Sequence, residues 1–384
     1  MSFRSVIDRE QAMPAGGRAR MRILVNMPSQ YGGKASGVAR VTFSLLERLL
    51  EQTGDDYILR SPWTRAQLPE SLRDSRLQLI ETPRPRIMVF DVVHQAAMLP
   101  ALCRQHGIDV LFNADPFGSP LGGKRRLTLV HDLYFKTIPE QIGWRATLTT
   151  DFIFKLMMAG SDQVICVSDA TRKDLARFYP AAANKSLTIH SDSTLNVDPE
   201  TLGLVPPVAG RYILVVGNAT SNKNFSLLGK AFAILGKKWP DLRVVHVGRD
   251  EAEEIACALA DPELKTRLIR LSGIDDRQLA ELYRHAACLC VPSTYEGFCL
   301  PVLEAQQLGC PVVCSNRSAT PEIAGNGALT FDPADTQSLV DALERLLGNP
   351  ELADNLRQAG YENRKLYSWQ KAAKSYAQLF QTRR

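Results

Sequence analysis

Short aliphatic runs alternate with stretches of helical periodicity along most of this chain, and that alternation limits its possible folds more than any other feature. Residues 21–27 form a β-rich run, residues 38–50 carry apolar side chains at helical spacing, and Gly32, Gly33 and Gly37 stand between them. Further strand-like runs lie at 110–112, 127–130, 163–167 and 187–190, with helical stretches near 87–105, 144–159 and 169–178. Such alternation predicts a parallel sheet covered on both faces.

A second series of the same kind follows a polar stretch at residues 191–210. Its strand-like runs are 212–217, 243–247, 288–292 and 311–314, and its helical stretches are 224–237, 276–287 and 302–308. The 384 residues are also about two and a half times the length of a common domain. We therefore expect an α/β protein of two doubly wound Rossmann-like domains, divided as a loose tail (1–20), a first domain (21–196), a linker (197–210), a second domain (211–366) and a final helix returning to the first domain (367–384).

The charge of the chain is unevenly distributed. Residues 1–196 hold 25 Lys and Arg against 19 Asp and Glu, whereas residues 197–384 hold 21 against 22. A basic first half is compatible with nucleic acid, with an anionic membrane or with an ordinary solvated face. No basic cluster is interleaved with aromatic residues, which disfavours binding of single-stranded nucleic acid.

Two further features bear on the compartment. No run approaches the ~18 apolar residues of a membrane span, and the first twenty residues lack the apolar core of a secretory signal. The eight cysteines form no CxxC pair and mostly lie among aliphatic residues. We expect buried, reduced thiols and a cytoplasmic protein.

Several familiar active-site motifs are absent. The sequence contains no GxxxxGK[ST] phosphate loop, no GxGxxG fingerprint, no HExxH and no GxSxG. It also has no Asp-x-Asp triplet of the kind that holds a divalent metal against a sugar-nucleotide diphosphate. We therefore expect a site without metal or cofactor.

The most informative segment is residues 293–315, where a strand leads through a loop into a helix with Pro301 in its first turn. Backbone amides ahead of a helix N-terminus favour a diphosphate, and here they belong to Gly297, Phe298, Cys299 and Leu300. Glu304 is placed to accept both hydroxyls of a ribose. Glu296 is placed to reach a sugar beyond the phosphates.

This segment resembles the GT-B glycosyltransferases of family 4, whose E-x7-E signature matches Glu296 and Glu304. Other matches are Val130-His131-Asp132-Leu133, the V-S-x-x-T-R-x-D-L run at 167–175, Gly217 with Lys223-Asn224, and Pro321-Glu322. The resemblance implies two domains facing across a cleft, with the donor in the second. It also implies that Lys223 neutralises the donor diphosphate and that Glu304 holds the ribose. Glu296 and the Gly297–Leu300 amides would hold the sugar and phosphates, and His131 would touch the sugar near the reacting centre.

Some positions depart from the family pattern. Asn218 and Asn222 stand where many relatives place an arginine beside the phosphate lysine, so Arg249 is a candidate helper at the donor site together with Asn218. In the glycine-rich loop the usual G-x-G-R is Gly37-Val38-Ala39-Arg40, and Gly37 and Arg40 are the acceptor candidates.

The resemblance implies a retaining glycosyltransferase that moves a hexosyl, preferably mannosyl, residue to a glycan or polyprenyl-diphosphate-linked saccharide in surface or exopolysaccharide synthesis. GDP-mannose is the favoured donor, with UDP-glucose and dTDP-rhamnose as alternatives. Because no carboxylate has a clear claim as nucleophile, front-face attack is favoured over double displacement. A scaffold that binds a sugar nucleotide without transfer, as an epimerase or an inactive partner subunit would, is the alternative function.

A peripheral contact with the inner face of an anionic membrane is a further expectation. Its candidates are the cations Arg84, Arg86, Lys124, Arg125 and Arg126 and the apolar residues 87–90. The competing interpretation is that 87–90 begins a buried helix with solvated arginines. No nucleic-acid partner is expected.

Overall fold

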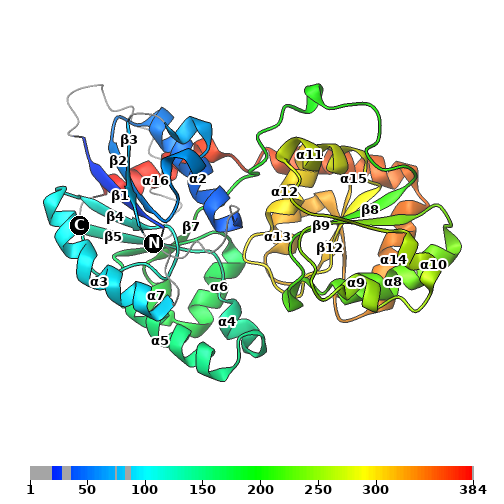
Figure 1. Ribbon diagram of the computed structural model, residues 1–384, viewed down its shortest axis with the longest axis horizontal. Coiled ribbons are helices and arrows are strands. Elements are labelled where there is room, and N and C mark those ends of the chain that lie inside the picture. Colours follow the sequence, from blue (N-terminus) through cyan, green and yellow to red (C-terminus); the bar gives the residue numbers. More distant parts are fainter. Residues whose placement is uncertain (1–19, 28–35, 74–75, 83–87, 383–384) are drawn as a thin grey trace.

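The computed structural model describes residues 20–27, 36–73, 76–82 and 88–382, and in these ranges the chain forms two α/β units, each built on one parallel sheet (Figure 1). The strand order is β3-β2-β1-β4-β5-β6-β7 in the first sheet and β10-β9-β8-β11-β12-β13 in the second. The prediction of an α/β protein with two Rossmann-like domains is confirmed. Residues 1–19 of the predicted tail lie outside the described residues, as do Gly32 and Gly33.

The first unit places the ends of β5 and β6 toward the second unit, because His131 and Ser168, which follow these strands, contact Gly297. Its strands are β1 (Arg22–Asn26), β2 (Asp56–Ser61), β3 (Leu77–Glu81), β4 (Val110–Asn113), β5 (Arg125–Val130), β6 (Gln163–Cys166) and β7 (Ser186–Thr188). Its helices are α2 (Gly37–Gln52), α3 (Met88–Gln105), α4 (Tyr134–Thr137), α5 (Trp144–Gly160), α6 (Asp169–Phe178) and α7 (Pro180–Ala183). Short 3-10 turns lie at Arg65–Gln67, Glu70–Arg73 and Pro139–Gln141.

The second unit repeats the pattern. Its strands are β8 (Tyr212–Val216), β9 (Arg243–Val247), β10 (Leu268–Leu271), β11 (Cys288–Val291), β12 (Val312–Ser315) and β13 (Ala328–Phe331). Its helices are α8 (Phe225–Lys238), α9 (Glu254–Cys257), α10 (Pro262–Thr266), α11 (Asp276–His285), α12 (Leu300–Gln307), α13 (Thr320–Ala324), α14 (Thr336–Leu347) and α15 (Pro350–Arg364). Short 3-10 turns lie at Pro199–Thr201, Ser221–Lys223 and Gly325–Gly327.

The central strands form because both of their faces are buried. In β1, β4 and β11 nearly every side chain is inaccessible to solvent, so these strands are almost continuous apolar runs. The helices between them bury apolar side chains against the sheets, and some begin at capping residues. Ser36 accepts a hydrogen bond from the Ala39 amide at the start of α2, and Ser168 accepts one from the Thr171 amide at the start of α6.

The chain returns to the first unit at its C-terminal end through α16 (Trp369–Gln381), the red helix beside α2 in Figure 1. Tyr376 and Phe380 pack their rings on Phe112 of β4, with centroid separations of 5.4 and 5.8 Å. Arg125 of β5 donates a hydrogen bond of 2.6 Å to the Leu379 carbonyl. The last helix therefore belongs to the core of the first unit.

Two other findings complete the description. All eight cysteines are free thiols, and seven are buried, with Cys257 the exposed exception. None of the helices in the described ranges has the length and apolar character needed to cross a bilayer.

Candidate functional site

Lys223 and Glu296 meet where strands β8 and β11 end. Lys223 closes the short turn before α8, and Glu296 lies in the loop between β11 and α12. Their side chains form an ion pair with an Nζ–Oε1 distance of 2.6 Å, and the Ser293 hydroxyl donates to the same oxygen at 2.7 Å. Burial by itself lowers the pKa of Lys223, but the charge and hydrogen bond of Glu296, together with Cys299 and Asp132, outweigh it and the pKa is raised. The structure thus holds a charged lysine and carboxylate together, out of most solvent contact.

Four backbone amides adjoin this pair, as the sequence predicts. Within the described residues, the amides of Gly297, Phe298, Cys299 and Leu300 donate no hydrogen bond to another protein group. Pro301 stands in the first turn of α12, and Cys299 just before the helix has φ +80°, a left-handed conformation that favours glycine. Unpaired amides at a helix N-terminus, next to a lysine, suit an anionic group.

The loop of the second unit that carries Glu296 lies directly against the end of β5 in the first. A Cβ atom added at Gly297 would lie 1.9 Å from the His131 carbonyl oxygen, so only glycine permits this approach. The hydroxyls of Ser168 and Thr171 donate to the Gly297 carbonyl at 2.6 and 3.1 Å. Both residues belong to the V-S-x-x-T run noted in the sequence, and this bonding gives that run a role in domain contact.

His131 is positioned at this contact by its own hydrogen bond. Its Nε2 lies 2.9 Å from the Ala114 carbonyl, which can only accept, so Nε2 carries the proton and Nδ1 is an acceptor in the neutral ring. Burial lowers the pKa of His131 and raises that of the adjacent Asp132. His131 is therefore held neutral, in one orientation, beside the loop of Glu296.

A tyrosine that sequence reasoning missed also joins the two units. The Tyr295 hydroxyl accepts from the Leu133 amide and donates to Asp174, both at 3.0 Å. The residue directly before Glu296 is thereby anchored to α6 and to the segment after His131. The only sequence signal was its position beside Glu296, since a tyrosine in a loop has many possible roles.

Glu304 is buried in α12 and is not free to act alone. Its two oxygens accept bonds from the Tyr283 hydroxyl at 3.0 Å and the Thr194 hydroxyl at 3.3 Å, and burial raises its pKa. Neither Tyr283 nor Thr194 was predicted from the sequence, because each lies far from Glu304 along the chain. Any ligand hydroxyl that binds Glu304 must share or replace these two bonds.

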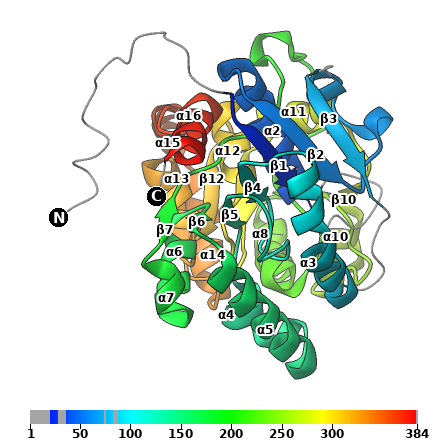
Figure 2. The same ribbon diagram turned by 90° about the vertical axis from the view of Figure 1, so that its left-hand side faces the viewer.

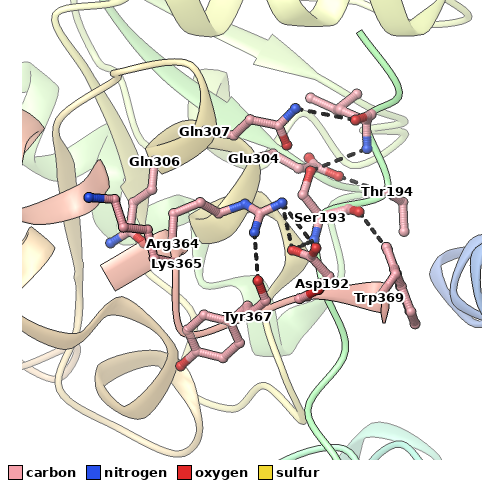
Figure 3. Close-up of polar contacts among 12 residues, drawn as sticks. Asp192, Ser193, Thr194, Glu304, Gln306, Gln307, Arg364, Lys365, Tyr367 and Trp369 are labelled. Atoms are coloured by element: carbon pink, nitrogen blue, oxygen red, sulfur yellow. Dashed lines mark hydrogen bonds and ion pairs between the residues drawn. The ribbon is translucent and has the colours of Figure 1, made fainter. Parts of the chain in front are cut away.

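The segment that carries Thr194 is fastened on its other side by the C-terminal end of the chain. Figure 3 shows Arg364 bonded to Asp192 and the Trp369 indole bonded to the Ser193 carbonyl. Gln307 of α12 also donates to the Leu195 carbonyl. Residues 191–195 are thus a rigid crossing between the units, and the exposed stretch follows from about residue 198.

Asn218 and Arg249 lie on the loops that follow β8 and β9. The Asn218 side-chain oxygen accepts from the Arg249 amide at 3.0 Å, so the two loops are tied together. A Cβ atom at Gly248 would lie 2.1 Å from the Gly217 carbonyl, which explains the glycine at the close of β9. Asn218 therefore stands at the end of β8, on the loop that leads to Lys223, and Arg249 stands at the end of the neighbouring strand β9.

The acceptor candidates lie at the start of α2. Gly37 is its first residue and lies near the Leu300 side chain. Arg40 forms a two-pronged ion pair with Asp276 of α11 at 3.0 Å and donates to Thr194 at 2.9 Å. The Arg40 guanidinium therefore links the two units.

Comparison with known proteins identifies the family. The model of glycosyltransferase family 4 matches residues 35–191, and that of the glycosyl transferases group 1 matches residues 203–363. Between them these matches take in both units and the site residues that the sequence predicted, although the crossing segment with Thr194 lies between the two matched ranges. The chain belongs to glycosyltransferase family 4.

Individual relatives of this family 4 chain are distant. The O-antigen chain mannosyltransferase B of Escherichia coli is 25% identical over 68% of this chain and 71% of its own length. The O-antigen chain mannosyltransferase RfbU of Salmonella typhimurium is 27% identical over 52% of this chain and 55% of its own. Among solved structures, the sucrose-phosphate synthase of Thermosynechococcus elongatus superposes with a TM-score of 0.74 at 19% identity, covering 94% of this chain and 98% of that one. At that identity the structural likeness establishes the GT-B fold alone.

Proposed function

We propose that this protein transfers a mannosyl residue from GDP-mannose to a glycan or a polyprenyl-diphosphate-linked saccharide. The observation that carries the proposal is the Lys223–Glu296 pair beside four unpaired amides, where the second sheet faces the first. The O-antigen mannosyltransferases among its relatives support mannose as the sugar.

Donor binding exchanges one set of partners for another. The donor diphosphate takes Lys223 and the amides of 297–300 as its hydrogen-bond donors. Glu296, released from Lys223, keeps the Ser293 hydroxyl as a partner and accepts hydrogen bonds from the sugar. The buried pair therefore holds both side chains ready without leaving either charge unpaired.

The chemical step follows from the same residues. With front-face attack, the acceptor hydroxyl approaches the anomeric carbon on the side that the diphosphate leaves, and its proton passes to the departing phosphate oxygen. Lys223 and the α12 amides stabilise the charge that grows on that oxygen. His131, neutral and fixed by Ala114, offers Nδ1 to a sugar hydroxyl. The configuration of the transferred sugar is retained.

A thermal-shift panel of GDP-mannose, UDP-glucose and dTDP-rhamnose tests the donor. A ligand at 100 times its Kd adds roughly 2.7 kcal/mol to stability, so one nucleotide sugar should raise Tm clearly above the others. GDP-mannose is the expected one. A response without product in the presence of acceptor would favour binding without transfer, and no response to any of the three would contradict the proposal.

A further inference from the structure

Helix α5 carries a row of large apolar side chains on its outer surface. Trp144, Leu148, Phe152 and Leu156 are each between 48% and 69% exposed, and they recur every four residues, which places them on one face. The opposite face of α5 packs into the first domain through Ile153, Phe154 and Met157. In the described part of the chain, only one face of α5 therefore packs against the rest of the protein.

Helix α3 also carries exposed apolar side chains. Phe90 and Val93 are 70% and 62% exposed, while Val92 between them packs in the same cluster as Ile153 and Phe154. Figures 1 and 2 both show α3 and α5 side by side on the outer edge of the first domain. We call Phe90, Val93, Trp144, Leu148, Phe152 and Leu156 the α3–α5 patch.

The exposed charged side chains on α3 and α5 themselves are all cations. The exposed charged residues of these two helices are Arg104, Arg145 and Lys155, whereas Asp91 and Asp151 are both 8% exposed. Arg145 lies over the Trp144 ring, 5.1 Å from its centroid. Lys155, beside Leu156, pairs with Asp151 at 2.9 Å but its side chain remains 60% exposed, and the exposed Glu140 lies just ahead of α5. Exposed tryptophan and aliphatic side chains edged by cations are typical of surfaces that enter the headgroup region of an anionic bilayer.

The cations suggested by the sequence are mostly used within the fold. Lys124 pairs with Asp109 at 2.7 Å, Arg126 pairs with Asp162 at 3.1 Å, and Arg125 bonds the Leu379 carbonyl. Residues 84–87 lie outside the described residues. A basic loop at 124–126 is therefore not the surface that we propose.

We propose that the α3–α5 patch docks the protein on an anionic lipid bilayer. Only α4 and a 3-10 turn separate Trp144 from the strand end that carries His131, so docking brings that end of the site toward the membrane. A second copy is the poorer occupant, because pairing of two such faces would bring cations together with no exposed carboxylate on either helix to oppose them. This inference goes beyond the transfer reaction, since lipid binding needs neither donor nor acceptor.

Co-sedimentation with vesicles tests the proposal directly on the full chain. Vesicles of 30% phosphatidylglycerol in phosphatidylcholine should bind the protein, pure phosphatidylcholine should bind it much more weakly, and added salt should weaken binding. The double variant Leu148→Ser/Phe152→Ser should lose about tenfold or more in affinity, and Arg145→Gln/Lys155→Gln should lose about tenfold. Leu366→Ser, at a residue 70% exposed in the other domain, is the matched control and should bind as the wild type does.

Tryptophan fluorescence separates docking from non-specific adsorption. Of the four tryptophans, Trp63 and Trp369 are buried and Trp239 is half-buried in the second unit, so a blue shift on adding anionic vesicles should arise mainly from Trp144 and should disappear in Trp144→Phe. Absence of binding to anionic vesicles, or equal binding by Leu148→Ser/Phe152→Ser, would overturn the proposal. So would a wild-type dimer in light scattering that the same double variant converts to monomer. Because no substrate is present, each of these failures would leave the proposed transfer reaction untouched.

Discussion

Glu322 should stabilise the closed arrangement of the two domains by about 2 kcal/mol. Its carboxylate, on α13 of the second domain, accepts hydrogen bonds from the Asp169 and Ala170 amides at the start of α6 and lies 2.8 Å from the His190 Nε2. Each bond to a charged group contributes about 1.5–3 kcal/mol, and a carboxylate at a helix N-terminus adds about 0.5 kcal/mol. Glu322→Gln keeps one acceptor oxygen and turns an NH₂ group toward a donor. Partial solvent exposure lowers the expected loss to about 2 kcal/mol.

The free energy of unfolding lost in Glu322→Gln should also depend on pH, and it should become smaller as the pH falls. Although burial opposes it, bonding to His190 and to the two amides holds the pKa of Glu322 below its ordinary value of 4.5. A carboxylate with a depressed pKa contributes its stability above the unfolded-state pKa and loses it as the pH falls through the folded-state value. The difference between wild type and Glu322→Gln should therefore be full near pH 7 and narrow below pH 4.5.

Urea unfolding of the full chain at several pH values measures this difference. Glu351→Gln is the matched control, because Glu351 also lies in the first turn of a helix but is exposed, and it should cost less than about 0.5 kcal/mol. A loss of unfolding free energy in Glu322→Gln as small as that of the control, or one that does not change below pH 4.5, would show that the Glu322 carboxylate does not stabilise the contact between the domains.

Three further predictions concern activity. Lys223→Ala should lower kcat and kcat/KM together by about 100- to 1000-fold, whereas Arg40→Ala, which breaks a partly exposed ion pair, should cost less than about tenfold in steady-state transfer assays. Similar small effects of both would place the diphosphate elsewhere. Gly297→Ala should reduce transfer by at least about tenfold because its Cβ would collide with the His131 carbonyl, while Gly54→Ala, with no atom within 4 Å, should have no effect. Transfer in EDTA should stay within about twofold of control, and complete loss restored by Mg²⁺ or Mn²⁺ would disprove charge neutralisation by Lys223 and the helix amides.

Most central strands of each sheet could be predicted from the sequence, as could the edge strand β7, but the other three edge strands could not. Central strands such as β4 and β11 are buried on both faces and therefore stand out as apolar runs. The sequence patterns do not reveal β2, β3, β10 or β13. Polar residues interrupt β3, β10 and β13, because edge strands are exposed on one side. In β2 the apolar run is interrupted by the buried Arg60, which bonds the Asn26 side chain.

The site was predictable as a set of residues but not as a network. Sequence motifs placed Lys223 and Glu296 in one donor site, but 73 positions separate them, and only the folded sheet brings them to 2.6 Å. The partners of Glu304, Tyr283 and Thr194, come from another helix and from the crossing segment. Contacts of this kind depend on how segments distant along the chain pack together, which no local pattern encodes.

The most direct test of the account is transfer of radiolabelled mannose from GDP-mannose to a polyprenyl-diphosphate-linked saccharide, with the product's anomeric configuration read by NMR. We expect label in the lipid-linked product with the α configuration of the donor retained, and at most about 1% of that rate for Lys223→Ala. An inverted product, or full activity in Lys223→Ala, would contradict it.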